Sequence, residues 1–248
     1  MKKKNNYYWM YSKHSIENAL LNQNRNILEI IIEKKFSNFY ENYFKIYDLN
    51  KNIKISIVTK KTIVKKIGKL AKYQGVALLV EKLSYDRIVS LDPRFSKESF
   101  IIIIDQLNDI KNFGALLRVA YAFGVKTIIT LDRFMPDENG YLASIASGAL
   151  DKINIFKVTN LTSIINYFKK DNWWIIGLES KKLDNCVDLK RQKNSFEKKV
   201  LIIGSESIGL RSLVRKNCDI LYRISTKNED LDSINLVQAA SIALYELT

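Results

Sequence analysis

The C-terminal part of the chain alternates between short apolar runs and amphipathic stretches. We expect strands at residues 100–105, 127–131, 153–158, 173–178, 199–204 and 220–224, because each is a nearly continuous apolar run of strand length. Helical periodicity fills the stretches near 114–123, 141–149, 161–170, 208–216 and 234–247. Continuous apolar strands separated by helices predict an α/β fold with a parallel sheet covered on both faces.

The first third of the chain has a different pattern, which predicts a small separate α/β unit. Its expected helices cover residues 15–22, 36–44 and 60–71, with Ser15 as the first N-cap, and its expected strands cover 27–33, 53–58 and 75–80. Residues 83–99 contain Asp92-Pro93 and little apolar periodicity. We therefore expect domains at residues 1–82 and 100–248, joined by a linker at 83–99.

The charge of the 248-residue chain is uneven. Residues 1–95 hold 19 Lys and Arg against 8 Asp and Glu, a net charge of +11 out of the total of +14. A basic N-terminal third beside a nearly balanced remainder favours a nucleic-acid-binding module. The alternative is a lysine-rich composition without a binding role. Five lysines on or near the expected 60–71 helix could contact phosphates, although a solvated charged face explains them equally well: Lys60, Lys61, Lys65, Lys66 and Lys69.

Several classes of protein are disfavoured. No apolar run approaches the about 20 residues of a membrane-spanning helix, and the N-terminus lacks a secretory signal, so we expect a cytoplasmic protein. Cys186 and Cys218 are far apart and without CxxC spacing, which disfavours a disulfide framework or a zinc site, and we expect no metal. His14 is the only histidine, so a Ser-His-Asp triad or an HExxH site could form only around it.

Polar residues follow the first strand of the expected sheet. Asn108, Asn112 and Gly114 precede Arg118, which lies in a helix that is apolar nearly all round. Such a helix is expected to be buried. Since burying an unpaired charge costs several kcal/mol, Arg118 must meet an anion, a carboxylate or solvent in a cleft. An internal salt bridge is the structural alternative.

A second group of residues follows the strand at 199–204. Gly204, Glu206 and Gly209 lie in the loop after this strand, and glycines permit tight turns and close backbone approach to a ligand. The carboxylate of Glu206 would repel a pyrophosphate, which argues against NAD or FAD. An ordinary strand-to-helix turn with an N-capping serine is the alternative.

A third group opens the last helix. Ser233 and Asn235 precede an alanine-rich stretch whose small residues permit close packing. Taken alone, these two side chains are better explained as helix caps than as ligand-binding groups.

The order and spacing of the three groups are more specific than any one of them. Asn-x-Gly-Ala-x-x-Arg after a strand, then Gly-Ser-Glu-x-x-Gly-Leu, then Ser-x-Asn, resembles the three motifs of the SpoU (TrmH) branch of the SPOUT methyltransferases. The resemblance covers residues 100–248, and Ser147-Gly148-Ala149 looks like the intermediate segment of the family. Upstream, Met10-Tyr11, His14 and residues 74–78 look like the substrate-binding domain of its 23S rRNA guanosine 2′-O-methyltransferases.

The resemblance implies a fold and an activity. The expected fold is an L30e-like RNA-binding domain followed by a parallel α/β domain with a deep trefoil knot. The expected enzyme is a homodimer that uses S-adenosylmethionine to methylate a ribose of ribosomal RNA, most specifically a guanosine of 23S rRNA. The implied catalytic residues are Asn112, Arg118, Glu206, Ser233 and Asn235. The implied cofactor residues are Ile203, Gly204, Glu206, Gly209, Ile224, Ser233 and Asn235.

Two positions depart from the family pattern. Ser207 stands where the family usually has a glycine, and Ser225 stands where it usually has a proline. Both changes bear on loop shape and cofactor affinity more than on the type of reaction. A tRNA or other rRNA 2′-O-methyltransferase of the same family, and a non-catalytic RNA-binding factor of ribosome assembly, are the competing hypotheses.

Overall fold

The computed structural model describes residues 6–45, 53–69, 71–90, 92–180, 183–191, 196–205, 208–228 and 233–248. The chain divides into two compact units. Unit 1 contains residues 1–84 together with residues 137–152, and unit 2 contains residues 85–136 and 153–248. The segment 137–152 therefore belongs to unit 1, although its place in the sequence put it inside the expected C-terminal domain.

Unit 1 is built on a four-stranded sheet with the order β1-β4-β2-β3. β4 runs antiparallel to β1 and β2, whereas β2 and β3 are parallel. The strands are β1 (Tyr7–Met10), β2 (Ile27–Glu33), β3 (Lys54–Val58) and β4 (Val76–Glu81). The sequence pattern did not predict β1, which has only four residues and obtains its backbone partners from β4.

Three helices of unit 1 lie close to their expected positions: α1 (Lys13–Leu21), α2 (Ser37–Lys45) and α3 (Lys60–Ile67). The expected cap of the first helix was wrong. α1 begins after Ser12, and the hydroxyl of Ser15 instead donates a hydrogen bond to the Ala143 carbonyl at 2.6 Å. α3 ends earlier than expected because Gly68 adopts a φ of +94°, a conformation outside the helical region.

Unit 2 contains a seven-stranded sheet with the order β7-β6-β5-β10-β8-β11-β9. All neighbouring strands are parallel, which confirms the predicted parallel α/β sheet. The strands are β5 (Phe100–Ile104), β6 (Thr127–Leu131), β7 (Asn154–Val158), β8 (Trp174–Leu178), β9 (Cys186–Asp188), β10 (Lys199–Ile203) and β11 (Ile220–Arg223). The trefoil knot stays a prediction.

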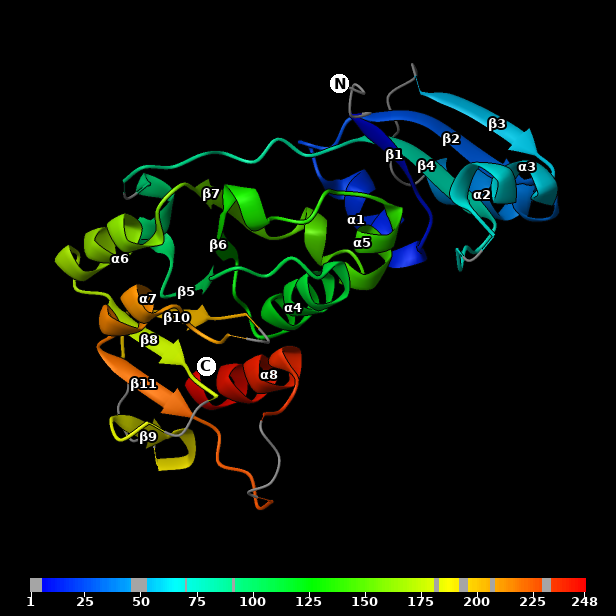
Figure 1. Ribbon diagram of the computed structural model, residues 1–248. Coiled ribbons are helices and arrows are strands. Elements are labelled where there is room, and N and C mark those ends of the chain that lie inside the picture. The colour runs from blue at the N-terminus through cyan, green and yellow to red at the C-terminus, as the bar shows by residue number, and fades with distance from the viewer. Residues whose placement is uncertain are drawn as a thin grey trace. The chain divides into compact units, whose positions relative to one another are not determined.

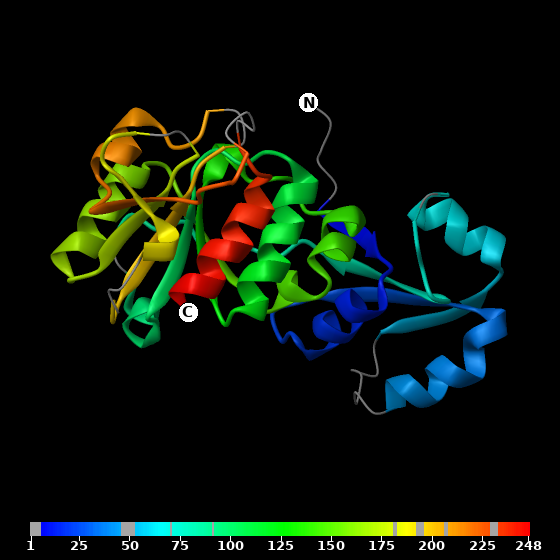
Figure 2. The same ribbon diagram turned by 90° about the horizontal axis from the view of Figure 1, so that it is seen from below.

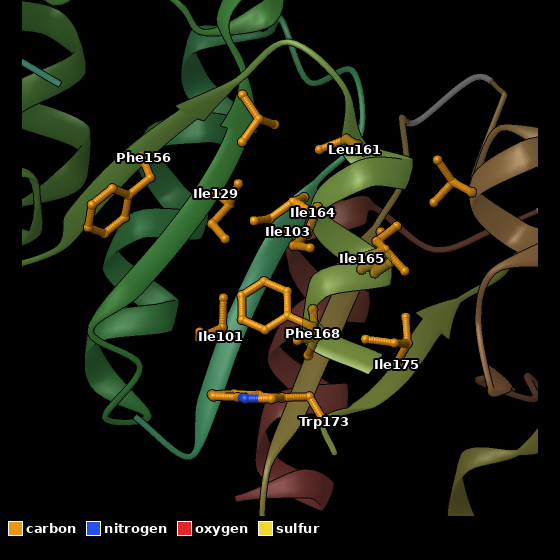
Figure 3. Close-up of a cluster of buried hydrophobic side chains, with 14 of the residues drawn as sticks. Ile101, Ile103, Ile129, Phe156, Leu161, Ile164, Ile165, Phe168, Trp173 and Ile175 are labelled. Atoms are coloured by element: carbon orange, nitrogen blue, oxygen red, sulfur yellow. The ribbon is translucent and has the colours of Figure 1, made fainter. Parts of the chain in front are cut away.

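One face of this sheet packs against α6 (Leu161–Lys170). Figure 3 shows the centre of this core, where apolar side chains of α6 meet those of β5 and β6. Phe168 of α6 contacts two other aromatic rings in this core: its ring centroid lies 5.1 Å from that of Trp173 and 5.5 Å from that of Phe95. Ile88 and Phe95 belong to this core, so much of the expected 83–99 linker is instead packed within unit 2.

α4 (Ile110–Ala122) and α8 (Leu236–Leu247) lie side by side on the other face of the sheet (Figures 1 and 2). α7 (Ser212–Lys216) is shorter than the helix expected at 208–216, because Gly209 has a φ of +71° and cannot be helical. α5 (Gly140–Ala146) ends at Ser147, which adopts a left-handed conformation, and it belongs to unit 1.

Candidate active site

A pocket of about 230 Å³ opens in unit 2 at the carboxyl ends of three neighbouring strands, β10, β8 and β11. Ligands of parallel α/β sheets usually bind at this edge, where loops are free to vary. The beginning of α8 completes the wall. The lining residues are Leu178, Glu179, Ser180, Ile203, Gly204, Ser205, Gly209, Arg223, Ile224, Thr226, Ser233, Ile234, Asn235, Leu236 and Ala239.

The structure brings most of the expected cofactor residues together around this pocket. Six of the seven line it: Ile203, Gly204, Gly209, Ile224, Ser233 and Asn235. Glu206, the seventh, lies outside the described residues, as does Ser207. Three separate segments of the chain, after β10, after β11 and before α8, thus contribute to one cavity.

The loop after β10 folds back on itself. The backbone N–H of Ser205 donates to the Gly209 carbonyl at 3.1 Å, and the N–H of Gly209 donates to the Ser205 carbonyl at 2.9 Å. A Cβ atom at Gly204 would lie 2.2 Å from the Gly209 carbonyl carbon, so only glycine fits there. The close approach of the Gly209 backbone within the loop therefore requires a glycine at position 204.

The loop also bears on the alternative interpretation of the second sequence group, an ordinary strand-to-helix turn with an N-capping serine. The side-chain oxygen of Ser205 accepts a hydrogen bond from the N–H of Ile208 at 3.3 Å, but the helix that follows starts only after Arg211. The expected N-capping serine is therefore not the cap of α7. The turn itself is present, and it is closed by the Ser205–Gly209 pair of backbone bonds.

Asn235 does cap α8. Its side-chain oxygen accepts a hydrogen bond from the N–H of Val237 at 2.9 Å, so the capping interpretation of the third group is confirmed for this residue. Asn235 and Ser233 also line the pocket. A capping side chain has a fixed position, which suits a residue that must also orient a ligand.

Asn112 and Arg118 lie on α4 and are not among the pocket-lining residues. The side chain of Asp109 caps this helix by accepting a hydrogen bond from the N–H of Asn112 at 2.8 Å. The expected burial of this helix holds for one side only: Leu116, Leu117 and Ala120 are buried, whereas Arg118 and Tyr121 are exposed. Arg118 has no ion pair with any residue that the structure describes, so the internal salt bridge is not found there.

The intermediate segment, Ser147-Gly148-Ala149, packs within unit 1. Ser147 and Gly148 both have positive φ values, 51° and 90°. A Cβ at Gly148 would lie 2.8 Å from the carbonyl oxygen of His14 in α1, so the glycine permits a close contact between these two segments. The local packing of unit 1 explains this glycine.

Sequence reasoning missed several pocket residues, of which Glu179 is the most informative. It follows the last residue of β8 and is only 2% exposed. Its carboxylate pairs with Arg215, whose Nε atom lies 2.7 Å from Oε2. The signal that could have found it is an acidic residue directly after an apolar strand, at the sheet edge where ligands bind.

The pocket fits a nucleoside-like cofactor. Leu178, Ile203, Ile224 and Leu236 provide apolar surface for a flat base, and the glycine loop permits close backbone approach. Polar residues, among them Arg223, Ser233 and Asn235, also line the pocket beside this apolar surface. Among the described residues, no cluster of His, Cys, Asp and Glu could hold a metal ion. Within the same residues, no helix combines the length and the apolar character of a membrane span.

The profile of the SpoU rRNA methylase family matches residues 99–245. The chain belongs to this family. The resemblance of its three motifs is thereby confirmed, and the chain is an RNA methyltransferase of the SpoU/TrmH type. The match covers the region that forms the pocket and the parallel sheet.

Curated relatives of this SpoU-family chain agree with the match. The 23S rRNA (guanosine-2′-O-)-methyltransferase RlmB of Coxiella burnetii is 31% identical over 181 residues, 71% of this chain and 70% of the relative. RlmB of Xylella fastidiosa is 27% identical over 257 residues, 99% of this chain and 97% of the relative. A Staphylococcus epidermidis protein of the TrmH family, named for tRNA or rRNA methylation, is 32% identical over 209 residues, 82% of each chain.

Solved structures share the fold. The AdoMet-bound rRNA methyltransferase of Sinorhizobium meliloti superposes with a TM-score of 0.78 at 18% identity, over 98% of this chain and 87% of the other. The SpoU methyltransferase AviRb of Streptomyces viridochromogenes, in complex with AdoMet, gives 0.77 at 17% identity, over 98% and 89%. At such identities the likeness concerns the fold.

Proposed function

We propose that this enzyme transfers the methyl group of S-adenosylmethionine to the 2′-hydroxyl of a ribose in ribosomal RNA, and that the target is a guanosine of 23S rRNA. The observation that carries the proposal is the single pocket formed by the loops of the second and third motifs. The two RlmB relatives support rRNA as the substrate. A cytoplasmic location, where ribosomal RNA is modified, is part of the proposal.

S-adenosylmethionine is the cofactor of this family and supplies an electrophilic methyl group on a sulfonium. We assign Ile203, Gly204, Gly209 and Ile224 to binding its adenosine part, through apolar contact and backbone groups. Ser233 and Asn235 line the same pocket from the start of α8. A ligand enclosed by backbone and apolar groups is held away from water, which suits a methyl transfer that water would otherwise compete with.

Catalysis requires that the ribose hydroxyl be oriented and lose its proton. Related enzymes suggest Arg118 as the base, but an arginine side chain stays protonated in proteins. A guanidinium fork is better suited to bind an RNA phosphate and orient the hydroxyl. Arg118 is exposed, in keeping with contact to a substrate anion. We assign Asn112 and Asn235 to fixing the geometry and Glu206 to accepting the hydrogen bond or proton.

We further propose that the active form is a homodimer. α4 and α8 pack together and leave large side chains exposed, with Tyr121 47%, Ile242 40% and Tyr245 73% accessible. Exposed apolar and aromatic surface on a monomer favours association with a partner. A second subunit seated on these helices would meet the exposed Arg118 of α4.

Unit 1 is assigned to RNA binding as an L30e-like domain. The lysines of α3 and its flanks are all exposed: Lys60, Lys61, Lys65, Lys66 and Lys69. Lys66 also contacts Glu29 and the ring of Trp9, so it has a structural role as well. Exposed lysines on one helix are suited to neutralise backbone phosphates, and the 2′-hydroxyl as target requires that the nucleic acid be RNA.

The test is transfer of labelled methyl groups from S-adenosylmethionine to unmodified 23S rRNA, 16S rRNA and tRNA, followed by nuclease mapping. Label in one 2′-O-methylguanosine of 23S rRNA is the expected result, and an RNA already methylated at that ribose is the matched control. Label in tRNA instead would favour the competing hypothesis of a tRNA 2′-O-methyltransferase of the same family. Cofactor binding without label on any RNA or ribosomal precursor would favour a non-catalytic RNA-binding factor.

A further inference from the structure

A second cavity opens at the same edge of the sheet of unit 2. It has a volume of about 290 Å³ and lies at the ends of β6 and β7, where α6 and α7 begin. The cofactor pocket lies at the ends of β10, β8 and β11, and β5 separates the two groups of strands in the sheet. Gly209 lines the cofactor pocket and Arg211 lines the second cavity, so the segment after β10 contributes to both.

Arg211 is the charged residue of this cavity, and a buried carboxylate holds it in place. Asp105, directly after β5, has a side chain that is 0% exposed. Nε of Arg211 donates to Oδ1 of Asp105 at 2.7 Å, and the backbone N–H of Arg211 donates to Oδ2 at 3.2 Å. These two bonds fix the position of the guanidinium, so the side chain loses little further entropy when a ligand binds to it.

The outer half of this guanidinium is available to a ligand. The Arg211 side chain is 33% exposed, and its Nη1 and Nη2 atoms have no hydrogen-bond partner among the residues that the structure describes. Neither nitrogen belongs to the buried polar atoms that lack a partner in the same part of the chain, so both reach solvent. A guanidinium bound through Nε thus presents its two amino groups as a planar fork of donors.

Half of the residues that line the cavity are apolar. Leu131, Leu161, Leu213 and Val214 supply this part of the wall. Leu213 is 61% exposed, so apolar surface extends to where the cavity meets solvent. An apolar wall with a few polar groups at one side suits a flat ring whose polar atoms lie along one edge.

The polar groups of the lining are richer in donors than in acceptors. Oδ1 of Asn160 accepts a hydrogen bond from the N–H of Thr162 at 2.9 Å, so this oxygen is used as the cap of α6 and the amide nitrogen is left as a donor. The guanidinium of Arg211 can only donate, whereas the hydroxyls of Thr159 and Thr162 can donate or accept. The cavity therefore favours a ligand whose polar edge carries acceptors.

Guanine matches this requirement better than the other groups of an RNA strand. Its O6 and N7 atoms are two neighbouring acceptors, which an arginine fork binds together, whereas adenine and cytosine present an amino group at the same edge. A phosphate suits the cavity less well. The carboxylate of Asp105, 2.7 Å from Nε of Arg211, offsets much of the positive charge that would attract a phosphate.

We propose that this cavity binds a guanine base of the RNA substrate, with the two Nη groups of Arg211 donating to O6 and N7. The inference deepens the proposed methylation of a guanosine and rests on it for the kind of substrate. Proteins read RNA in this way when a base is unstacked and turned out of the strand. Since the segment from Gly209 to Arg211 connects the two cavities, a base held by Arg211 would keep the RNA strand beside the cofactor.

The experiment measures the binding of mononucleotides by ligand-observed NMR, which needs no RNA and no methyl transfer. The full-length protein is mixed with excess S-adenosylhomocysteine to occupy the cofactor pocket. It is then titrated with GMP, AMP, CMP, UMP and 7-deazaguanosine monophosphate. We expect GMP to bind at least about fivefold more tightly than AMP, CMP or UMP. The 7-deaza analogue lacks the N7 acceptor and should bind about threefold more weakly than GMP.

Two matched variants test the role of the fork. Arg211→Lys keeps a cation beside Asp105 but removes the planar pair of donors, so the preference for GMP should disappear. Arg215→Lys is the control. Arg215 also pairs through Nε with a buried carboxylate, that of Glu179 at 2.7 Å, but it does not line the cavity. This control should keep the wild-type preference.

Equal binding of the four natural nucleotides by the wild-type protein would overturn the inference, as would an unchanged preference in folded Arg211→Lys. Equally weakened binding of all four in that variant would indicate contact with the phosphate and would also overturn it. If Arg211→Lys does not fold, the 7-deaza analogue decides: binding as tight as that of GMP overturns the inference, and weaker binding supports it. Failure of S-adenosylhomocysteine to bind would contradict the proposed cofactor, while the nucleotide preference would still decide the role of Arg211.

Discussion

The Nε atom of Arg25 donates a hydrogen bond to Oδ1 of Asp151 at 2.8 Å, although the two residues are 126 positions apart. The same guanidinium pairs with Glu138 and donates to the Glu81 carbonyl at 2.9 Å. The three charged side chains are at most 2% exposed. This buried network ties the segment 137–152 to the N-terminal sheet of unit 1, and Tyr8 adds a hydrogen bond to Glu138 at 2.8 Å.

Loss of the central cation should destabilise unit 1. Arg25→Met leaves two buried carboxylates without their guanidinium, and we expect the free energy of unfolding to fall by about 3–5 kcal/mol. Denaturant unfolding measures the change. Lys82→Met is the matched control, because Lys82 also pairs with the segment through Asp137 at 2.8 Å, but that carboxylate is 54% exposed. The control should lose no more than about 1 kcal/mol. Equal losses in both variants would contradict the role of burial.

A methyl group at Gly204 should displace the loop that forms one wall of the cofactor pocket. A Cβ there would lie 2.2 Å from the Gly209 carbonyl carbon, so the loop after β10 must move. We expect Gly204→Ala to weaken binding of S-adenosylhomocysteine at least about tenfold, the equivalent of about 1.4 kcal/mol. Gly124→Ala is the control: its φ is +77° but its Cβ would meet nothing within 4 Å. It should cost about 1 kcal/mol of stability through strain and leave binding unchanged. Normal binding by Gly204→Ala would show that the loop yields easily.

Removal of the exposed arginine of α4 should abolish methyl transfer without unfolding the protein. For Arg118→Ala we expect a loss of at least about 100-fold in the transfer rate, as for other donors that act in a transition state. The melting temperature should hardly change, because Arg118 is exposed. Arg118→Lys keeps the charge but not the planar fork and should restore only part of the rate. Unfolding of Arg118→Ala would mark the residue as a structural ion-pair partner.

The thiol of Cys218 should be unreactive in the folded protein. Burial raises its pKa to about 12, so the reactive thiolate is scarce at pH 8 and increases only as the pH approaches that value. We expect iodoacetamide to modify Cys218 far more slowly in the native than in the denatured protein, as followed by mass spectrometry. Burial also raises the pKa of Cys186, and single Cys→Ser variants separate the two sites. Rapid native labelling of Cys218 would show that the end of α7 opens readily.

The sequence by itself determined the class of fold and the family. Apolar runs such as 100–105 and 199–204 are visible in the local sequence alone. The structure has a strand at each of them, β5 and β10. The resemblance of the motifs to the SpoU family implied that Gly204, Gly209, Ser233 and Asn235 bind one cofactor, and these four residues line one pocket. Local capping at Asn235 could be inferred as well, since the bond spans only two residues.

Only the tertiary structure decided how distant segments meet. β5 pairs with β10, and the short strand β1 pairs with β4, which lies about 70 positions further along the chain. The segment 137–152 belongs to unit 1 because Arg25 and Ser15 bind it there, and no periodicity marks such contacts. The pairing of Glu179 with Arg215 was hidden for the same reason, because the two residues are 36 positions apart. Contacts between residues that are far apart in the sequence leave no local pattern, so they become visible only when the chain is folded and its side chains pack together.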